Sequence, residues 1–264
     1  MPGSHGDAVR SVPRDVPWGY PAVVAGVIGS IFAGQIGLLV AALIHGSAIT
    51  SAAGPLWGLA LSSLFLQLVT GGVPLFVAAS GPRAPSPRSD LGGRGPVAGR
   101  PALSFQRARD ALGLSIAWID LPIGIAVGVF AQLVLVWLLY APLSRWITPD
   151  DLEGPARQLG DLVHNPADRV LLVLMVCVGA PISEELMYRG LLLRALHRRL
   201  GRRPAVVISA GVFALVHFQG VQLPGLLLIG LILASLVMWT DRLGTSMVAH
   251  AAFNAVTVIQ LLAR

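Results

Sequence analysis

The chain has 264 residues, of which 55% are hydrophobic and only 12% are charged, and its mean hydropathy is +0.73. A soluble domain of this size needs more polar surface than this composition supplies, so the class of soluble globular proteins is excluded. The net charge of +6 comes from nineteen arginines, because the chain contains no lysine. These arginines stand between apolar runs, which indicates membrane topology rather than nucleic-acid binding.

The apolar runs predict an all-α, polytopic bundle of transmembrane helices, since about 20 apolar residues span the hydrocarbon core of a bilayer. Seven spans are expected, and eight is the alternative count. The seven are 20–44, 55–79, 117–140, 170–196, 204–219, 223–240 and 244–262. The single cysteine, Cys177, lies within one of them, so disulfides play no part in the fold.

Three regions follow from this pattern: a leader at 1–19, N-terminal spans with an Arg/Gly/Pro-rich loop at 20–116, and a core at 117–264. The loop from Gly81 to Arg100 lacks apolar periodicity and is expected to lead into a short surface helix around Phe105–Leu114. Asp120 and Gln35 lie in or beside spans, and each is interpreted as an interface or packing residue.

Arginine counts predict that the N-terminus is cytoplasmic. With this orientation the inner side carries fourteen arginines and the outer side only four. The absence of lysine indicates a GC-rich, bacterial genome. We therefore expect an integral protein of the bacterial plasma membrane with a cytoplasmic leader at 1–19, and seven spans would leave the C-terminus outside.

Two adjacent acids, Glu184 and Glu185, lie in the fourth span. An ionisable residue inside a spanning helix costs roughly 2.5–3.5 kcal/mol on insertion scales, so two neighbouring acids require a reason. Glu185 precedes Arg189 by four residues, which is the favourable order for a helical ion pair. Glu184 points about 100° away and shares its stripe with Tyr188, so one acid is expected to be paired and the other available. The alternative is that both acids merely mark the headgroup level at the helix end.

Histidines mark the two other helices of interest. Ser209, Phe213 and His217 recur at steps of four and are expected to share one helix face. Glu184 and His217 lie at similar distances from the connecting loop, so their side chains are expected at similar depth. His250 and Asn254 are again four residues apart. The alternatives are a core histidine for the first and polar contacts that join helices for the second.

Together, the motifs EExxxR at 184–189, FxxxH at 213–217 and HxxxN at 250–254 resemble those of the CPBP family. This family covers CAAX-processing endopeptidases and bacteriocin-processing proteins. The resemblance extends over about 170–262 and identifies the region 117–264 as a CPBP-like core. It implies a glutamate-dependent intramembrane protease that acts on membrane-associated or lipid-modified peptide or protein substrates in the bilayer, without a cofactor.

The resemblance also implies a role for each motif residue. Glu184 would be the general base and would act with His217 on a water molecule. His250 and Asn254 would hold the oxyanion. The supporting residues around them would be Glu185, Tyr188, Arg189 and Phe213. We expect the polar atoms of Glu184, His217 and Asn254 to lie within about 3–7 Å of one another, which allows for one bridging water.

Other functions remain open at this stage. Glu185, His217 and His250 could hold a zinc ion with water as the fourth ligand. This alternative ranks second, because Glu185 is expected to pair with Arg189 and because Asn254 suits an oxyanion better than zinc. A non-catalytic membrane partner, such as an immunity or regulatory protein, would use the same polar cluster for binding. A small proton-coupled transporter is disfavoured by the lack of an internal repeat.

Overall fold

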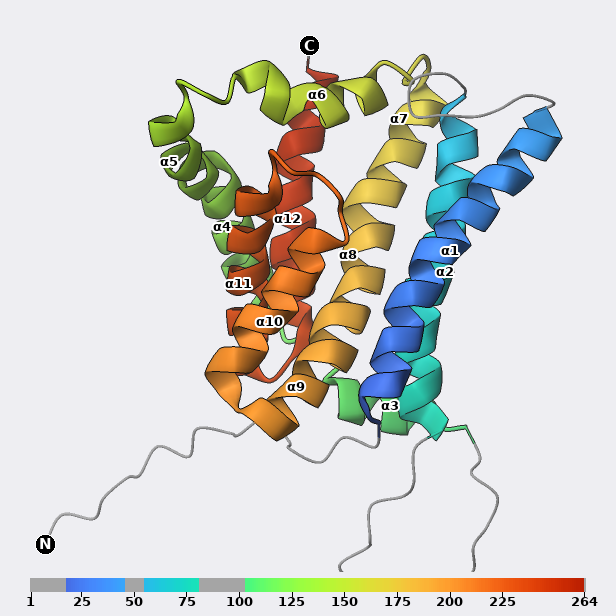
Figure 1. Cartoon of the computed structure of the whole chain (residues 1–264), viewed down its shortest axis with the longest axis vertical. Coiled ribbons are helices and arrows are strands. Elements are labelled where there is room, and N and C mark those ends of the chain that lie inside the picture. The colour runs from blue at the N-terminus through green and yellow to red at the C-terminus, as the bar shows by residue number, and fades with distance from the viewer. Residues whose placement is uncertain (1–17, 46–54, 81–102, 264) are drawn as a thin grey trace, which may run out of the picture.

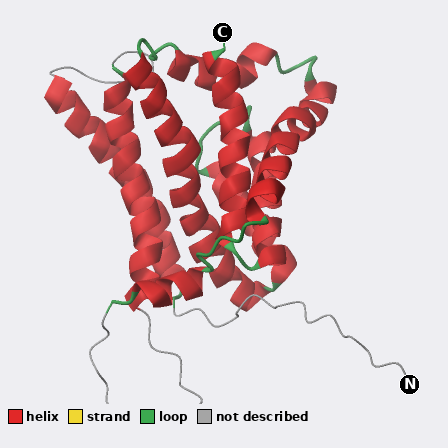
Figure 2. Ribbon diagram, turned by 180° about the vertical axis from the view of Figure 1, so that it is seen from behind, coloured by secondary structure: helices red, strands yellow, loops and turns green. Residues whose placement is uncertain are grey.

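The structure is a computed structural model that describes residues 18–45, 55–80 and 103–263. Every regular element in these residues is a helix, which confirms the all-α class (Figure 2). The α-helices are α1 (Tyr20–His45), α2 (Leu56–Ser80), α3 (Phe105–Leu112), α4 (Asp120–Phe130), α5 (Val136–Tyr140), α6 (Pro149–Gly160), α7 (Pro166–Val173), α8 (Ala180–Glu184), α9 (Leu193–Leu200), α10 (Arg202–Leu215), α11 (Leu223–Thr240) and α12 (Leu243–Leu262). Short π and 3-10 stretches join some of them: η1 (Ala131–Leu135), η2 (Ala141–Leu143), η3 (Leu174–Gly179) and η4 (Glu185–Leu192).

Six helical stretches in the described residues are long and apolar enough to cross a membrane, which confirms a polytopic bundle. They are Tyr20–His45, Leu56–Ser80, Asp120–Leu143, Pro166–Leu200, Leu223–Thr240 and Leu243–Leu262. Each matches a predicted span within a few residues. The leader residues 1–17 and the predicted loop between Gly81 and Arg100 lie outside the described residues.

The remaining predicted span, 204–219, is wrong in length. Its helix, α10, has only 14 residues and ends at Leu215. At 1.5 Å per residue it is about 21 Å long, short of the roughly 30 Å of a hydrocarbon core. The polar residues His217 and Gln219 and then Gly220 follow, and 216–222 is not helical. Since α10 begins at the end of the bundle that carries α3 and α11 begins near α6, α10 and segment 216–222 together carry the chain across (Figure 1).

Two short helices lie at opposite ends of the bundle (Figure 1). The predicted surface helix around Phe105–Leu114 is confirmed as α3. The Ser104 side chain accepts a hydrogen bond from the Arg107 amide at its start, and Gly113 follows its end with a φ of 69°. At the other end, α6 begins with a capping box in which Thr148 and Asp151 exchange hydrogen bonds. The two ends are called the α3 end and the α6 end below.

Small residues allow the long helices to approach closely. A Cβ atom on Gly37 of α1 would collide with the Ser62 backbone of α2, and a Cβ on Gly128 of α4 would collide with the Ala249 carbonyl of α12. The Ser62 hydroxyl also donates to the Gly34 carbonyl of α1 at 2.8 Å. Such small-residue contacts drive helix association in membranes, where lipid removes the hydrophobic advantage of burial.

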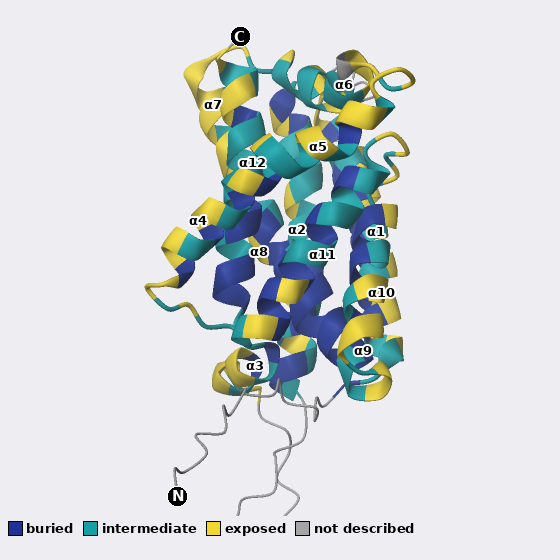
Figure 3. Ribbon diagram, turned by 90° about the vertical axis from the view of Figure 1, so that its left-hand side faces the viewer, coloured by how far each residue is buried: buried dark blue, intermediate teal, exposed yellow. Residues whose placement is uncertain are grey.

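Buried residues gather around α8 and α11 in the half of the bundle nearer α3 (Figure 3). The start of α1 is fixed there, because the buried Trp18 indole donates to the Leu191 carbonyl of η4 at 3.0 Å. Asp120 is confirmed as a packing residue: it is fully buried and joins α4 to Arg242 and Thr245. The same interpretation of Gln35 is wrong, because Gln35 lies on the exposed face of α1.

Candidate active site

Both acids lie near the middle of one continuous helical stretch, Pro166–Leu200, that contains two π-helical segments. Glu184 is the last residue of α8 and Glu185 is the first residue of η4. A π turn holds one more residue than an α turn, so it changes the direction in which the following side chains point. Such turns are frequent at functional sites, where they place side chains that a regular helix would direct elsewhere.

Side chains from other helices stabilise the two π segments by donating to their carbonyls. In η3, Gln67 of α2 donates to the Met175 carbonyl at 3.0 Å, and Asn254 of α12 donates to the Val176 carbonyl at 2.8 Å. In η4, the Ser209 hydroxyl donates to the Tyr188 carbonyl at 2.9 Å. Carbonyls that lose their α-helical partners inside a membrane must be satisfied by the protein. The geometry around the acids therefore depends on α2, α10 and α12.

Glu185 lies at the centre of a fully buried polar cluster. Its Oε1 atom is 3.0 Å from Nη1 of Arg189, which confirms the predicted four-residue ion pair. The Ser246 hydroxyl donates to its Oε2 atom, and Nδ1 of His250 lies 3.1 Å from Oε1. Arg189 also donates to the Gly230 carbonyl at 3.2 Å, so the pair is tied to α11. Both Glu185 oxygens have partners on other side chains, so the contacts of this carboxylate are those of a structural residue.

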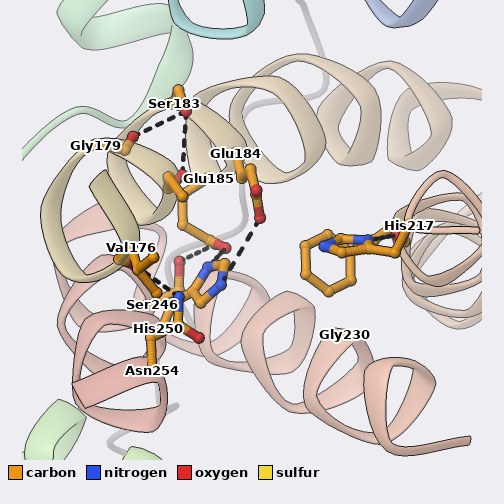
Figure 4. Close-up of polar contacts among 12 residues, drawn as sticks. Val176, Gly179, Ser183, Glu184, Glu185, His217, Gly230, Ser246, His250 and Asn254 are labelled. Atoms are coloured by element: carbon orange, nitrogen blue, oxygen red, sulfur yellow. Dashed lines mark hydrogen bonds and ion pairs between the residues drawn. The ribbon is translucent and has the colours of Figure 1, made fainter. Parts of the chain in front are cut away.

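Glu184 differs from its neighbour, because its side chain retains 16% exposure and its one ion-pair partner in the described part of the chain is His250. Oε2 of Glu184 is 3.7 Å from Nε2 of His250, longer than a hydrogen bond. Figure 4 shows His250 between the two acids, with one ring nitrogen directed at each. The expectation of one paired and one available carboxylate therefore holds.

The contacts of His250 determine where its protons lie. Glu185 is held ionised by Arg189 and Ser246, so it can only accept, and Nδ1 of His250 must carry a hydrogen. The Nε2 atom then faces the Glu184 carboxylate, and the two groups can share a further proton. An imidazole held in this way has a fixed orientation and presents Nε2 to the exposed side of Glu184.

Phe213 joins the histidines to the ion pair. Its ring makes edge contacts with Tyr188, His217 and His250, with centroid separations of 5.4, 4.7 and 5.8 Å. The guanidinium carbon of Arg189 lies 4.4 Å from the centre of the same ring, in cation–π geometry. A single buried aromatic ring thus positions groups from η4, α10 and α12.

His217 lies in the turn just beyond α10, so the prediction that it continues the helix face of Ser209 and Phe213 is wrong. Its Nδ1 atom is 2.6 Å from the Phe213 carbonyl. A carbonyl only accepts hydrogen bonds, so Nδ1 carries the hydrogen and Nε2 carries the lone pair of the neutral ring. This contact ends the helix and leaves His217 half-buried with a free basic nitrogen.

Asn254 lies one turn beyond His250 on α12, and its side-chain amide donates to Val176. In the view of Figure 4, Asn254 and His217 lie on opposite sides of Glu184. Glu184 contacts His250, and the Phe213 ring contacts both His250 and His217. Asn254 instead contacts η3 through the Val176 carbonyl. The mutual approach of Glu184, His217 and Asn254 to within about 3–7 Å stays a prediction.

One comparison with known proteins bears on this arrangement. Residues 166–256 match the protein family described as "Type II CAAX prenyl endopeptidase Rce1-like". The match covers about a third of the chain and supports membership of the CPBP family for this part. The match contains all three CPBP motifs, from Glu184 to Asn254, whereas α1 to α6 lie before it. No curated protein and no solved structure matches the chain.

The contacts of Glu185 are unfavourable for the zinc alternative, in which Glu185, His217 and His250 would be the ligands. Among the described residues, no three His, Cys, Asp or Glu side chains are grouped as ligands for a metal ion. Of the three proposed ligands, Glu185 already uses Oε1 for Arg189 and His250 and Oε2 for Ser246. A zinc ion would therefore have to displace the ion pair that neutralises the fully buried Arg189.

Two residues of the CPBP site were missed by the sequence reasoning. Ser246 precedes His250 by four residues, so the same spacing rule that identified Asn254 would have found it. Gln67 lies in α2, outside the family match, and is a single polar residue in an apolar span. The sequence around Gln67 gives no signal of a role in this site. Its hydrogen bond to the Met175 carbonyl is visible only once α2 is packed against η3.

Proposed function

We propose that this CPBP protein is a glutamate-dependent intramembrane endopeptidase that cleaves peptide bonds of lipid-modified, CAAX-type or membrane-embedded substrates. The observation that carries the proposal is the difference between the two acids: Glu185 is saturated by three partners, whereas Glu184 keeps an exposed carboxylate edge. A carboxylate with a free edge in a site of low dielectric can accept a proton from water. Membership of a protease family supports the same chemistry.

In the proposed reaction, Glu184 removes a proton from a water molecule, and the water oxygen attacks the substrate carbonyl. The lone pair on Nε2 of His217 accepts a hydrogen bond from the same water and orients it. The tetrahedral oxyanion accepts hydrogen bonds from Nε2–H of His250 and from the second N–H of the Asn254 amide. Glu184 then returns the proton to the leaving amine as the C–N bond breaks. One donor of this kind contributes about 3–4 kcal/mol to transition-state stabilisation.

The supporting residues act through His250. Glu185 accepts a hydrogen bond from Nδ1–H of His250, and the charge of Arg189 keeps Glu185 ionised. In this mechanism His250 donates from Nε2 as an imidazolium, with a hydrogen on both ring nitrogens. Phe213 and Tyr188 exclude water from one side of this pair. No metal takes part in this mechanism. We expect that metal-free protein, verified by elemental analysis after exhaustive chelation, retains full activity, and that loss on chelation with rescue by zinc would defeat the proposal.

We also propose that the α3 end faces the cytoplasm of a bacterial cell. Eight described arginines lie at or near this end, against three at the α6 end (Figure 1). Those at the α3 end are Arg107, Arg109, Arg194, Arg198, Arg199, Arg202, Arg203 and Arg242. Those at the α6 end are Arg145, Arg157 and Arg169. The excess agrees with the positive-inside rule and leaves the leader at 1–19 cytoplasmic. Labelling of single cysteines at the two ends in intact cells tests this orientation.

The decisive experiment compares Glu184→Gln with the wild-type protein in detergent or liposomes. Probes are an internally quenched farnesylated CAAX peptide and an unmodified transmembrane peptide, which separate the two substrate classes. We expect Glu184→Gln to lower kcat by about 10²–10⁴-fold with an unchanged melting temperature. The matched control, Asp161→Asn, removes an exposed acid at the α6 end and should retain activity. Cleavage by folded Glu184→Gln would reject the base assignment, and no cleavage by the folded wild-type protein would favour the non-catalytic partner.

A further inference from the structure

Segment 216–222, between α10 and α11, has unpaired backbone groups beside the candidate active site. Within the described structure, no hydrogen bond reaches the amide N–H groups of residues 219–222 or the carbonyls of residues 216–219. His217, the second residue of the segment, contacts Phe213 and through it the His250 side chain. Among the described residues, the segment therefore has backbone donors and acceptors without a hydrogen-bond partner, and its His217 is linked through Phe213 to His250, which contacts the proposed base.

The same segment exposes large apolar side chains. Phe218 is 79% exposed and Val221 is 40% exposed. Lipid would accommodate these side chains but would leave the backbone groups without partners, at a cost of several kcal/mol for each group. Water would satisfy the backbone but not the apolar side chains. An extended apolar peptide satisfies both, because it supplies backbone donors and acceptors together with hydrophobic contacts.

The segment is fixed at both ends rather than loosely connected. His217 binds the Phe213 carbonyl at its start. Near its end, the Tyr140 hydroxyl donates to the Val221 carbonyl at 2.9 Å, and the Gln222 amide donates to the Leu152 carbonyl of α6 at 2.6 Å. Phe218 also has a φ of 53°, a conformation that is costly for an aromatic residue and is kept only where the surroundings impose it. A backbone held in this way loses little entropy when a partner binds.

We propose that segment 216–222 is the substrate-docking edge of the protein. The substrate chain lies extended along it, next to the bond to be cleaved, and pairs its own N–H and C=O groups with the free backbone groups of the segment. Phe218 and Val221 contact apolar substrate side chains. This inference rests on the proposed peptidase function and adds the mode of substrate binding, which recognises an extended apolar backbone rather than one particular side chain.

The first test uses substrate variants with the wild-type protein. The farnesylated quenched peptide is N-methylated at one backbone position at a time, away from the scissile bond. Extended pairing uses the N–H of every second residue toward a given edge, so kcat/KM should fall about three- to tenfold at alternate positions and less than about twofold between them. Equal, small effects at every position, with the parent peptide cleaved, would overturn the docking proposal and leave the proposed function intact.

The second test changes the segment itself. Gln219→Pro removes the side chain and the N–H, whereas Gln219→Ala removes only the side chain, so the proline variant should lose more kcat/KM by about three- to tenfold. Both variants are first compared by melting temperature. Equal activity in two folded variants would contradict a pairing role for this N–H.

The third test does not depend on turnover. p-Benzoylphenylalanine replaces Phe218 in the Glu184→Gln protein, and the farnesylated peptide is added before irradiation. The control carries the same photoreactive residue at Phe32, which is 64% exposed on α1. We expect a cross-link from position 218 and not from position 32. Equal cross-linking would show mere partition into the detergent and would reject the site. If no peptide is cleaved by any form of the protein, the proposed function fails, and this cross-link alone decides whether the segment binds peptide.

Discussion

Asp120 at the α3 end and the Glu184–Glu185 pair near the middle of the bundle are both carboxylates held inside a membrane protein, but they are satisfied differently. Asp120 has a donor on every side: Arg242 binds both oxygens, Thr245 binds Oδ1 at 2.6 Å, and the Ala117 amide binds Oδ2 at 2.7 Å. Glu185 is similarly saturated, whereas within the described ranges Glu184 has one polar contact, with His250 at 3.7 Å. Saturation identifies a group that joins helices, and an unsatisfied edge identifies one available for chemistry.

Removing the charge of Glu185 should give the largest change in stability. Glu185→Gln leaves the fully buried Arg189 without a counter-ion, so the free energy of unfolding should fall by about 3–5 kcal/mol. Activity should fall only in part, because His250 keeps its contact with Glu184. Denaturant titration in detergent measures the first effect, and cleavage per folded molecule measures the second.

The double variant Glu185→Gln with Arg189→Met is the matched control. It removes both charges of the buried pair, so it should recover part of the lost stability. A Glu185→Gln protein with wild-type stability and no activity would show that the roles of the two acids are exchanged.

Asp120→Asn should have a smaller effect, although Asp120 is equally buried. Its partner Arg242 retains 31% exposure, so the freed guanidinium stays hydrated and the cost is the loss of charged hydrogen bonds, about 1.5–3 kcal/mol. Cleavage per folded molecule should remain at the wild-type level. A loss of activity without a loss of stability would remove the distinction between the two carboxylate sites.

The sequence predicted the parts of this comparison that depend on local spacing. Glu185 and Arg189 pair because they are four residues apart on one helix, and α3 begins and ends at Ser104 and Gly113 because these residues are good helix caps. The early end of α10 was missed, because it depends on the His217 ring binding the Phe213 carbonyl rather than on composition. The π segments were also missed, because an α and a π turn differ little in local energy and are selected here by donors on other helices.

Gln67 tests whether those donors hold the acids in place. Gln67→Met keeps a long unbranched side chain but removes the hydrogen bond to Met175, so stability should fall by about 1–2 kcal/mol and kcat should fall severalfold as η3 relaxes. The control is Gln35→Met, because Gln35 lies on the exposed face of α1, and this variant should match the wild-type protein. Equal behaviour of the two variants would show that α2 does not influence the acids.

Asp151 on the surface helix α6 gives the smallest expected effect. Its hydrogen bonds with Thr148 lower the pKa of its carboxyl below the usual value of 3.8. A carboxyl whose pKa is lower in the folded state stabilises the fold above its unfolded pKa, and this contribution disappears as the pH falls through the folded value. The melting temperature should therefore fall slightly more steeply below about pH 4 in the wild-type protein than in Asp151→Asn. Identical pH profiles would show that ionisation of Asp151 adds no measurable stability.

The short length of α10 also affects how the chain enters the membrane during synthesis. A helix of 14 residues that begins with Arg202 and Arg203 lacks the apolar length to insert on its own. We therefore expect it to enter the bilayer together with α11, whose 18-residue helix is long and apolar enough to span and packs against it. On this expectation, the segment that contains His217 joins the acids of the preceding helix only after α11 has been synthesised.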